Sequence, residues 1–312
     1  MKTTRERIYS VTSSAAPSIV LGDANYPANL REISTPPERL YVRGAVTDDD
    51  ALAVAIVGSR TATSYGLAVA ERLAAELAAR GITVVSGLAR GIDSAAHRGA
   101  LRASGRTIAV LGSGVDVIYP PENRRLAREI EARGAVLSQF APGTRPLAGH
   151  FPARNRVIAG LALGVVVVEA AERSGSLITA GLAGELGREV MAVPGPVTSA
   201  QSVGAHRLIQ DGAALVMSGE DVISQLPLQW RDRVRPGPAP HAAAITPLVP
   251  DQQDDQAKLL LDVIGEEPTD IDGIIERSGL TPGRASALLV ALEVEGRIRQ
   301  LAGKRFVHVN LG

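Results

Sequence analysis

The chain has 312 residues, 45% of them hydrophobic and 3% aromatic, which is enough for one large α/β domain and a small second one. It contains no cysteine, which excludes disulfides, thiolate metal sites and cysteine nucleophiles. The sequence has no run of about 18 apolar residues and no secretory signal. We therefore expect a soluble, cytoplasmic protein without membrane association.

Basic and acidic residues balance at 33 each, and a net charge of zero argues against a nucleic-acid partner. The arginines, however, are unevenly distributed. Between Arg90 and Arg156 there are eleven arginines against five acidic residues. A GC-rich genome would explain why arginine outnumbers lysine, but not this clustering. The local excess of positive charge favours a polyanionic ligand.

After residues 1–25, which we expect to be a disordered arm, strand and helix patterns alternate. Apolar runs indicate strands at residues 54–57, 82–85, 107–111, 135–138, 165–168, 190–193 and 214–217. Helical patterns lie between them, at residues 66–80, 93–103, 122–133, 155–163, 176–187 and 205–211. Wholly apolar strands that alternate with helices are typical of a parallel sheet covered on both faces. We predict a Rossmann-like, doubly wound, mostly parallel α/β domain over residues 26–226, with its ligand at the carboxyl ends of the strands.

The C-terminal part of the chain has a different character. Residues 227–253 are rich in proline and alanine without periodicity, which indicates a linker. Amphipathic helices are expected at residues 254–265, 271–278 and 281–295, followed by a hairpin of strands at residues 297–301 and 306–309. Three helices and a hairpin predict a winged-helix domain over residues 254–312.

Two glycine-containing loops at predicted strand ends have the composition of anion sites. Gly58, Ser59 and Arg60 follow the first strand, and the turn Ser174-Gly175-Ser176 opens the helix that carries Thr179. Free backbone N–H groups and the helix dipole bind anions at such positions, and Arg60 can add a bidentate charge. The alternative for the first loop is an ordinary βα turn with a solvated arginine.

Two further loops are weaker candidates. Asp93 and His97, four residues apart after the loop at residues 87–93, could form an acid–base pair. A carboxylate at a helix start with a packed histidine one turn later is the interpretation we favour. The loop at residues 112–114 lacks the third glycine of a dinucleotide fingerprint, so we expect no cofactor.

A basic cluster with one aromatic residue precedes the fifth strand. Phe151 is predicted in a proline-flanked loop beside Arg154, Asn155 and Arg156. An aromatic ring next to paired arginines can stack a base while the arginines hold its phosphates. The alternative is a loop phenylalanine that fills the core. Arg124 is a further candidate DNA contact, although a solvated helix face explains it well.

Catalytic and metal-binding patterns do not emerge from the sequence. There is no G-x-S-x-G elbow, and the five histidines lack metal-ligand spacing. Because all the loops above follow predicted strands, the fold would bring them to one rim. The sequence therefore predicts a polyanion site without catalytic or metal-binding residues.

In order along the chain, eight motifs resemble the DNA-processing protein A (DprA/Smf) family. They are YPANLREISTPPERLYVRG, AIVGSR, SGLARGIDSAAHRGAL, LGSGVDVIYPPENRRL, FPARNRVIAGL, VVVVEA, SGSLITA and AVPG, within residues 26–226. Many members carry a helical domain before the first motif. Because only 25 residues precede Tyr26, we expect either that this domain is absent or that the given start is internal.

The resemblance implies a single-stranded-DNA-binding protein that protects incoming DNA and helps load the RecA recombinase during natural transformation. It also implies a homodimer, for which residues 205–226 are our candidate interface. In the family the GSR, FPxRNR and SGSxxTA segments line the DNA pocket. Carried over, the resemblance assigns DNA contacts to Ser59 and Arg60, to Phe151, Arg154, Asn155 and Arg156, and to Gly175, Ser176 and Thr179.

Two other functions remain as alternatives. A nucleoside-monophosphate phosphoribohydrolase of the lysine-decarboxylase-like family shares the architecture, but Leu182 replaces its catalytic glutamate and Ile178 its third glycine. A winged-helix regulator of duplex DNA would need a basic recognition helix. Residues 254–312 contain ten acidic against seven basic residues, and the helix at residues 281–295 offers only Arg284. We therefore expect the winged helix to contact protein.

Overall fold

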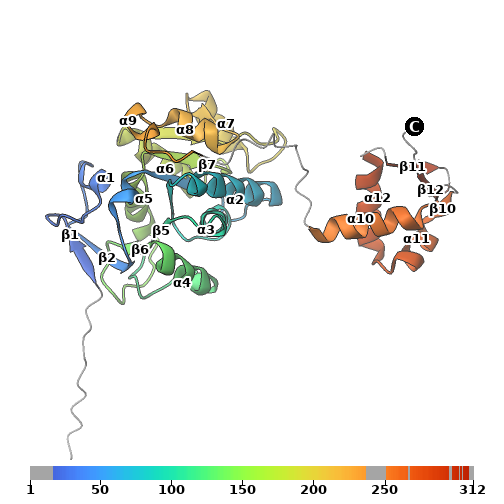
Figure 1. The fold of residues 1–312 in the computed structure, drawn as a ribbon, viewed down its shortest axis with the longest axis horizontal. Helices are drawn as coiled ribbons and strands as arrows, with labels where there is room; N and C mark the ends of the chain where they lie inside the picture. Colours follow the sequence, from blue (N-terminus) through green and yellow to red (C-terminus); the bar gives the residue numbers. More distant parts are fainter. Residues whose placement is uncertain are drawn as a thin grey trace, which may run out of the picture. The chain divides into compact units, whose positions relative to one another are not determined.

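The computed structural model describes residues 17–236, 251–265, 268–294, 297–301, 303 and 305–308. The chain divides into two compact units, Met1–Ala239 and Pro240–Gly312, which are described separately (Figure 1). The predicted arm falls mostly on residues 1–16, outside the described part. Ser18–Val20 and Ala28–Arg31, by contrast, form the first strand and helix, so regular structure begins inside the segment expected to be an arm.

The larger unit is built on a nine-stranded sheet in the order β1-β2-β6-β5-β4-β3-β7-β8-β9. Strands β3 to β9 are parallel, and β1 and β2 add an antiparallel edge beside β6. The strands are β1 Ser18–Val20, β2 Arg39–Gly44, β3 Ala53–Val57, β4 Thr83–Ser86, β5 Thr107–Val110, β6 Ala135–Ser138, β7 Gly164–Val167, β8 Glu189–Ala192 and β9 Ala214–Leu215. The predicted doubly wound, mostly parallel α/β class is confirmed.

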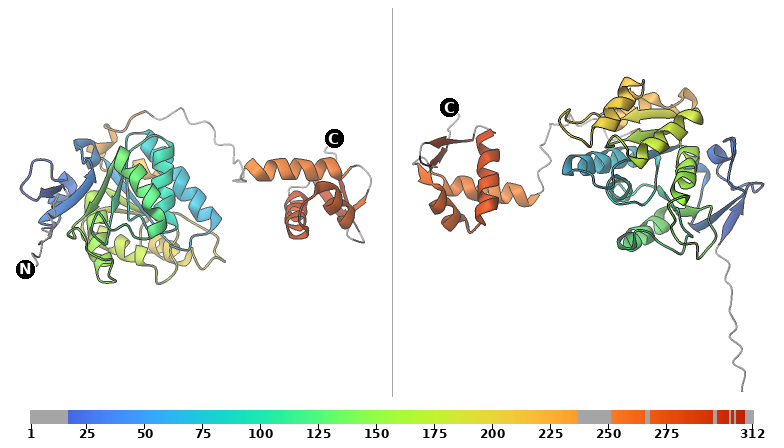
Figure 2. Two further views of the ribbon diagram at one scale, coloured as in Figure 1. Left: turned by 90° about the horizontal axis from the view of Figure 1, so that it is seen from below. Right: turned by 180° about the vertical axis from the view of Figure 1, so that it is seen from behind.

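Helices cover both faces of this sheet (Figure 2). The helical segments are α1 Ala28–Arg31, η1 Asp48–Ala51, α2 Ser64–Ala79, α3 Ile92–Arg102, η2 Pro121–Asn123, α4 Arg124–Arg133, α5 His150–Leu161, α6 Gly175–Glu185, α7 Val203–Gln210, α8 Gly219–Gln225 and α9 Leu228–Arg231. In β3, Ala55 and Val57 pack with α1, α5 and α6, whereas Val54 and Ile56 pack with α2, α3 and α8. Because side chains alternate along a strand, burial on both faces requires a wholly apolar strand.

Helix α5 departs most from the sequence prediction. It starts at His150, not at residue 155, so Phe151 lies in its first turn and not in a loop. Pro152 does not prevent this, because the N–H groups of a first helical turn have no intrahelical partner and proline fits there. As a result, Arg154 and Arg156, which are two positions apart at about 100° per residue, point to nearly opposite sides of the helix.

The smaller unit contains α10 Asp251–Val263, β10 Thr269–Asp270, α11 Ile271–Ser278, α12 Pro282–Val294, β11 Ile298–Leu301 and β12 Arg305–His308. The strands form a sheet in the order β10-β12-β11, and Leu260, Ile274, Leu289 and Phe306 lie in a shared core. This confirms the winged-helix domain. The linker predicted over residues 227–253 is shorter on both sides, because α9 lies within it and α10 begins at residue 251. Residues 237–250 lie outside the described part.

Candidate nucleic-acid interface

The candidate site lies where the strand order reverses. From β3 the chain adds β4, β5 and β6 on one side and then β7, β8 and β9 on the other. Helices on opposite faces leave a crevice beyond the carboxyl ends of the strands at such a switch point. Here the crevice consists of two adjoining hollows that share Arg60, Ala89, Phe151 and Arg154.

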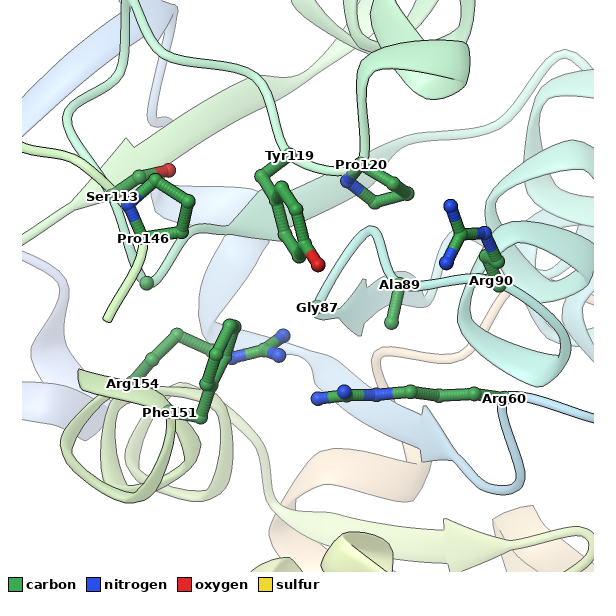
Figure 3. Close-up of a pocket in the computed structure, with 11 residues that line it drawn as sticks. Arg60, Gly87, Ala89, Arg90, Ser113, Tyr119, Pro120, Pro146, Phe151 and Arg154 are labelled. Carbon is green, nitrogen blue, oxygen red and sulfur yellow. The ribbon is translucent and has the colours of Figure 1, made fainter. Parts of the chain in front are cut away.

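We call them the Tyr119 hollow and the Ser176 hollow. The first has a volume of about 430 Å³ and is lined by Arg60, Gly87, Ala89, Arg90, Gly112, Ser113, Tyr119, Pro120, Pro146, Phe151 and Arg154 (Figure 3). The second, of about 1260 Å³, extends to the loops after β3 and β7 and includes Gly58, Ser59, Asn155, Arg173, Gly175, Ser176 and Thr179. Four arginines and one acid, Asp93, line the two hollows together.

The loop after β3 is held by its neighbours on both sides. The Ser59 N–H donates to the Glu169 carbonyl at 2.7 Å, and the Ile92 N–H donates to the Ser59 carbonyl at 3.2 Å. A Cβ on Gly58 would lie 2.8 Å from the Glu169 carbonyl oxygen, and one on Gly91 would lie 2.2 Å from that of Ser59. Glycine is therefore required at both positions for the loops to approach one another.

The loop after β4 adopts a constrained backbone conformation. Leu88 has a φ of 58°, which is rare for a residue with a Cβ, yet its side chain is fully buried. The Asn123 side-chain amide donates to the Leu88 carbonyl at 2.8 Å, and the Asp93 carboxylate accepts from the N–H groups of Gly87 and Ala89. These contacts, together with burial of Leu88, hold the loop rigidly at the rim.

Arg154 lies beneath this loop as a buried cation. Its side chain is 5% exposed, and a Cβ on Gly87 would collide with its guanidinium. Its Nη1 lies 3.8 Å from the Asp93 carboxylate and donates to the Val110 carbonyl at 3.4 Å, while Nε has no partner among the described residues. Burial raises the pKa of Asp93, and the Arg154 charge partly offsets this. A buried guanidinium with unused donors can donate further hydrogen bonds to an anionic ligand.

Arg60 and Phe151 meet across the crevice. The guanidinium carbon of Arg60 lies 5.2 Å from the centre of the Phe151 ring, and that of Arg154 lies 5.8 Å from it (Figure 3). Both separations permit cation–π attraction. Arg60 is exposed and takes part in none of the ion pairs of the described residues. Its charge therefore faces the crevice without a carboxylate partner.

The amino terminus of α6 opens onto the Ser176 hollow. Ser174 caps the helix, its side chain accepting from the Ser176 N–H at 3.3 Å, and the Ser174 and Ser176 hydroxyls lie 2.7 Å apart. Asn155 links α5 to this turn by donating to the Gly175 carbonyl at 3.4 Å. Free N–H groups, hydroxyls and the helix dipole at one point favour an anion.

The structure brings together nine of the eleven predicted residues, namely Gly58, Ser59, Arg60, Phe151, Arg154, Asn155, Gly175, Ser176 and Thr179. Arg156 and Arg124 do not line either hollow. Arg156 turns away along α5, and its guanidinium lies 3.7 Å from the Glu185 carboxylate on α6. Arg124 is exposed on α4. The lining residues outside the predicted set include Arg90, Tyr119 and Arg173. Arg173 could have been found from its position directly before the Ser174 turn.

His97 has a structural role. It is fully buried, and its Nδ1 lies 2.7 Å from the Thr107 hydroxyl, which donates to the Val84 carbonyl at 2.7 Å. The hydroxyl therefore accepts from Nδ1–H. Burial lowers the pKa of His97 to about 3, so the ring is neutral, and it does not line the crevice. The structural interpretation of the Asp93 and His97 pair fits this geometry.

The position of the catalytic glutamate of the phosphoribohydrolases is occupied here by a side chain without acid–base chemistry. Leu182, which replaces the catalytic glutamate of the phosphoribohydrolases, packs against the core. Within the described ranges, no three carboxylate or imidazole groups are arranged to hold a metal ion. None of the helices that the structure describes is long and apolar enough to cross a membrane.

The fold and site thus define a doubly wound α/β protein with a cationic crevice at its switch point, followed by a winged helix. The model of the DNA recombination-mediator protein A family matches residues 18–227, and that of the DprA winged helix domain matches residues 239–304. The chain belongs to this family.

Individual relatives are similar over most of the chain. The Smf protein of Escherichia coli is 42% identical over 283 residues, covering 89% of this chain and 74% of the relative. The X-ray structure of DprA from Streptococcus pneumoniae has a TM-score of 0.64 at 47% identity, covering 68% of this chain and 75% of the other. DprA from Helicobacter pylori, whose structure is described for its single-stranded DNA binding mode, has a TM-score of 0.60 at 31% identity, covering 67% and 95%.

Proposed function

We propose that this protein binds single-stranded DNA in the crevice and delivers it to the RecA recombinase in the cytoplasm, during natural transformation or recombination. The observation that carries the proposal is the convergence of Arg60, Arg154 and the α6 amino terminus beside the Phe151 ring. Cations and helix N–H groups suit phosphates, and an aromatic ring that lines a hollow suits bases. The DNA-binding mode described for the Helicobacter pylori relative supports the same assignment.

Single-strand binding is tested by titrating labelled oligo-dT with the full chain over a series of salt concentrations. The protein should bind in the nanomolar to micromolar range, and the logarithm of the association constant should fall linearly with the logarithm of salt concentration. Sequence preference should be slight, because stacking and phosphate contacts do not identify bases. Failure to bind any single strand at low salt would refute the proposal.

Delivery to the recombinase needs a separate experiment. RecA assembly on single strands coated with single-strand-binding protein shows a lag, which is followed through RecA ATP hydrolysis. We expect this protein to shorten the lag, and the Arg60→Gln variant, which has a weakened DNA site, to shorten it less. An unchanged lag with the wild-type protein would refute the RecA part alone.

The same proposal includes a homodimer formed through the sheet edge at β9. A terminal strand presents unpaired backbone groups, and near it Leu215 is 47% and Met217 is 60% exposed. Isologous pairing of this edge would cover both side chains. Sedimentation of the wild type at twice the chain mass, and of Met217→Glu at the mass of one chain, is the expected result.

A further inference from the structure

Glu169 is a buried carboxylate near the crevice that the proposed function does not use. It lies two residues after the end of β7, is 2% exposed and lines neither hollow. It takes part in none of the ion pairs printed for the described residues. A buried charge is costly unless hydrogen bonds or dipoles compensate it, so the contacts of Glu169 indicate its role.

Glu169 holds both ends of the loop after β3, residues 58–63, which we call the Arg60 loop. At the first end, the Ser59 N–H donates to the Glu169 backbone carbonyl at 2.7 Å. At the second end, the Glu169 carboxylate accepts from the Thr63 N–H at 2.9 Å and from the Thr63 hydroxyl at 2.5 Å. Arg60 lies between these two attachments, so one buried residue fixes the backbone on both sides of it.

The same carboxylate occupies the amino terminus of α2. Thr63 is the N-cap of this helix, and its hydroxyl accepts from the Gly66 N–H at 3.1 Å. A Cβ on Gly66 would lie 2.4 Å from the carboxyl carbon of Glu169, so glycine leaves room for the carboxyl group. The positive end of the α2 dipole compensates the buried charge. An anionic ligand therefore finds the amino terminus of α2 filled, whereas that of α6 is open.

The position of the Arg60 guanidinium depends on these attachments. The side chain is exposed, lines both hollows and lies over the Phe151 ring, with no carboxylate partner among the described residues (Figure 3). A long side chain loses conformational entropy when it binds a phosphate, and a fixed backbone beneath it reduces that loss. The Arg60 loop therefore determines how well Arg60 is placed before a strand binds.

We propose that Glu169 is a positioning residue for DNA binding: through Thr63 it fixes the Arg60 loop so that the Arg60 guanidinium faces a phosphate of the bound strand. This inference rests on the proposed binding of single-stranded DNA and adds a residue that does not itself touch the strand. Breaking the contact between Glu169 and Thr63 leaves Arg60 in place but releases its loop. Affinity then falls through Arg60, and by no more than the loss of Arg60 itself.

The test measures oligo-dT affinity of full-chain variants in which this contact is broken from either side. Thr63→Ala removes the hydroxyl, and Gly66→Ala displaces the carboxyl group while it favours the helix. Each should weaken binding about fivefold, whereas Thr63→Ser keeps the hydroxyl and should bind like the wild type. In the Arg60→Gln background, Thr63→Ala and Gly66→Ala should each change affinity by less than about 1.5-fold, because the residue they act through is gone.

Thr83→Ala is the matched control. The Thr83 hydroxyl also donates to a buried carboxylate, that of Asp50, at 2.9 Å, but at the amino ends of the strands and outside both hollows. Urea denaturation establishes that each variant is folded. Thr83→Ala should lower the urea midpoint, as Thr63→Ala does, and leave oligo-dT affinity unchanged.

The positioning role would be refuted if Thr63→Ala and Gly66→Ala both bound oligo-dT like the wild type, or if either lost the same factor in the Arg60→Gln background. These results would leave the proposed function intact, since it depends on binding by the wild type. Failure of the wild type to bind oligo-dT would overturn the proposed function itself and the positioning role with it.

Discussion

Arg106, at the amino ends of the parallel strands, and Arg60, at their carboxyl ends, differ in what their guanidinium groups contact. Arg106 donates to both oxygens of Asp50, at 2.9 and 2.8 Å, and to the Ala45 carbonyl at 2.9 Å. Asp50 also accepts from the Thr83 hydroxyl and the Thr47 N–H. Every strong donor and acceptor in this network is matched within the protein.

Arg60 instead stacks over an aromatic ring and has no carboxylate within reach among the described residues. The Nη1 of Arg154 lies 3.8 Å from the Asp93 carboxylate, and its Nε has no hydrogen-bond partner among the described residues. A buried polar group is normally satisfied, so unmatched donors that line a hollow indicate a ligand. Arg106 at the amino edge therefore stabilises the fold, whereas Arg60 at the carboxyl edge is available for binding.

Of the changes proposed here, replacement of Asp50 should have the largest effect. It should lower the free energy of unfolding without changing DNA affinity. Asp50→Ala removes the partner of Arg106 and Thr83, and loss of one member of a buried pair costs about 3 kcal/mol. Urea denaturation should show this loss, whereas oligo-dT affinity of the folded protein stays unchanged. Asp49→Ala, at the exposed neighbouring position, is the control and should be neutral. A tenfold loss of DNA affinity in Asp50→Ala would contradict the assignment of a purely structural role to this network at the amino edge.

His97 predicts a pH dependence of stability. Because burial lowers its pKa from 6.5 to about 3, the unfolded chain binds a proton between these values that the native protein does not. The free energy of unfolding should therefore fall as pH decreases through this window, by about 2 kcal/mol between pH 8 and 5 from this group. Denaturation curves of His97→Asn should lack that part of the dependence. Equal slopes in both proteins would show that His97 does not cause it.

Arg60→Gln should weaken DNA binding without a change in stability. Loss of one phosphate contact should reduce affinity about tenfold at 0.1 M salt and flatten the log–log salt slope by about 0.7. Arg133→Gln is the matched control, because Arg133 donates to the Leu101 carbonyl on an exposed surface away from the crevice. If Arg60→Gln kept the wild-type slope, Arg60 would not hold a phosphate.

Deletion of residues 254–312 should have the smallest effect on single-strand binding. The winged helix has its own core, and residues 254–312 contain ten acidic against seven basic residues, so we expect this domain to add little to phosphate binding. The truncated protein should bind oligo-dT within about threefold of the full chain. A loss of more than about tenfold, roughly 1.4 kcal/mol, would mean that this domain contributes directly.

Much of the larger unit could be predicted from its sequence. Wholly apolar strands require helices on both faces of the sheet, and in a parallel sheet the loops after the strands lie together at the carboxyl edge. Gly58, Ser59, Arg60 and Ser176 follow strands, so their convergence needed only the fold class. The antiparallel edge was missed because β1 has only three residues and β2 carries two arginines. Such strands lack the apolar run that marks a core strand.

Side-chain direction was harder to predict than position. The basic cluster after Phe151 is helical, so Arg154 points inward and Arg156 towards Glu185, which no linear pattern reveals. The burial of Arg154 depends on Asp93, 61 residues earlier in the chain. Tyr119 was missed because its place beside Phe151 depends on a contact between residues 32 positions apart, which the sequence around Tyr119 does not reveal.

Photochemical cross-linking most directly tests whether the strand binds at the carboxyl edge. Aromatic residues are present at both edges: Tyr119 and Phe151 line the crevice, whereas Tyr26 and Trp230 line a groove of about 860 Å³ at the amino edge. Single strands that contain 5-iodo-deoxyuridine would be irradiated in the complex and the modified peptides identified by mass spectrometry. We predict adducts on Tyr119 or Phe151. Adducts on Trp230, with both crevice residues unmodified, would contradict the assignment of the DNA site.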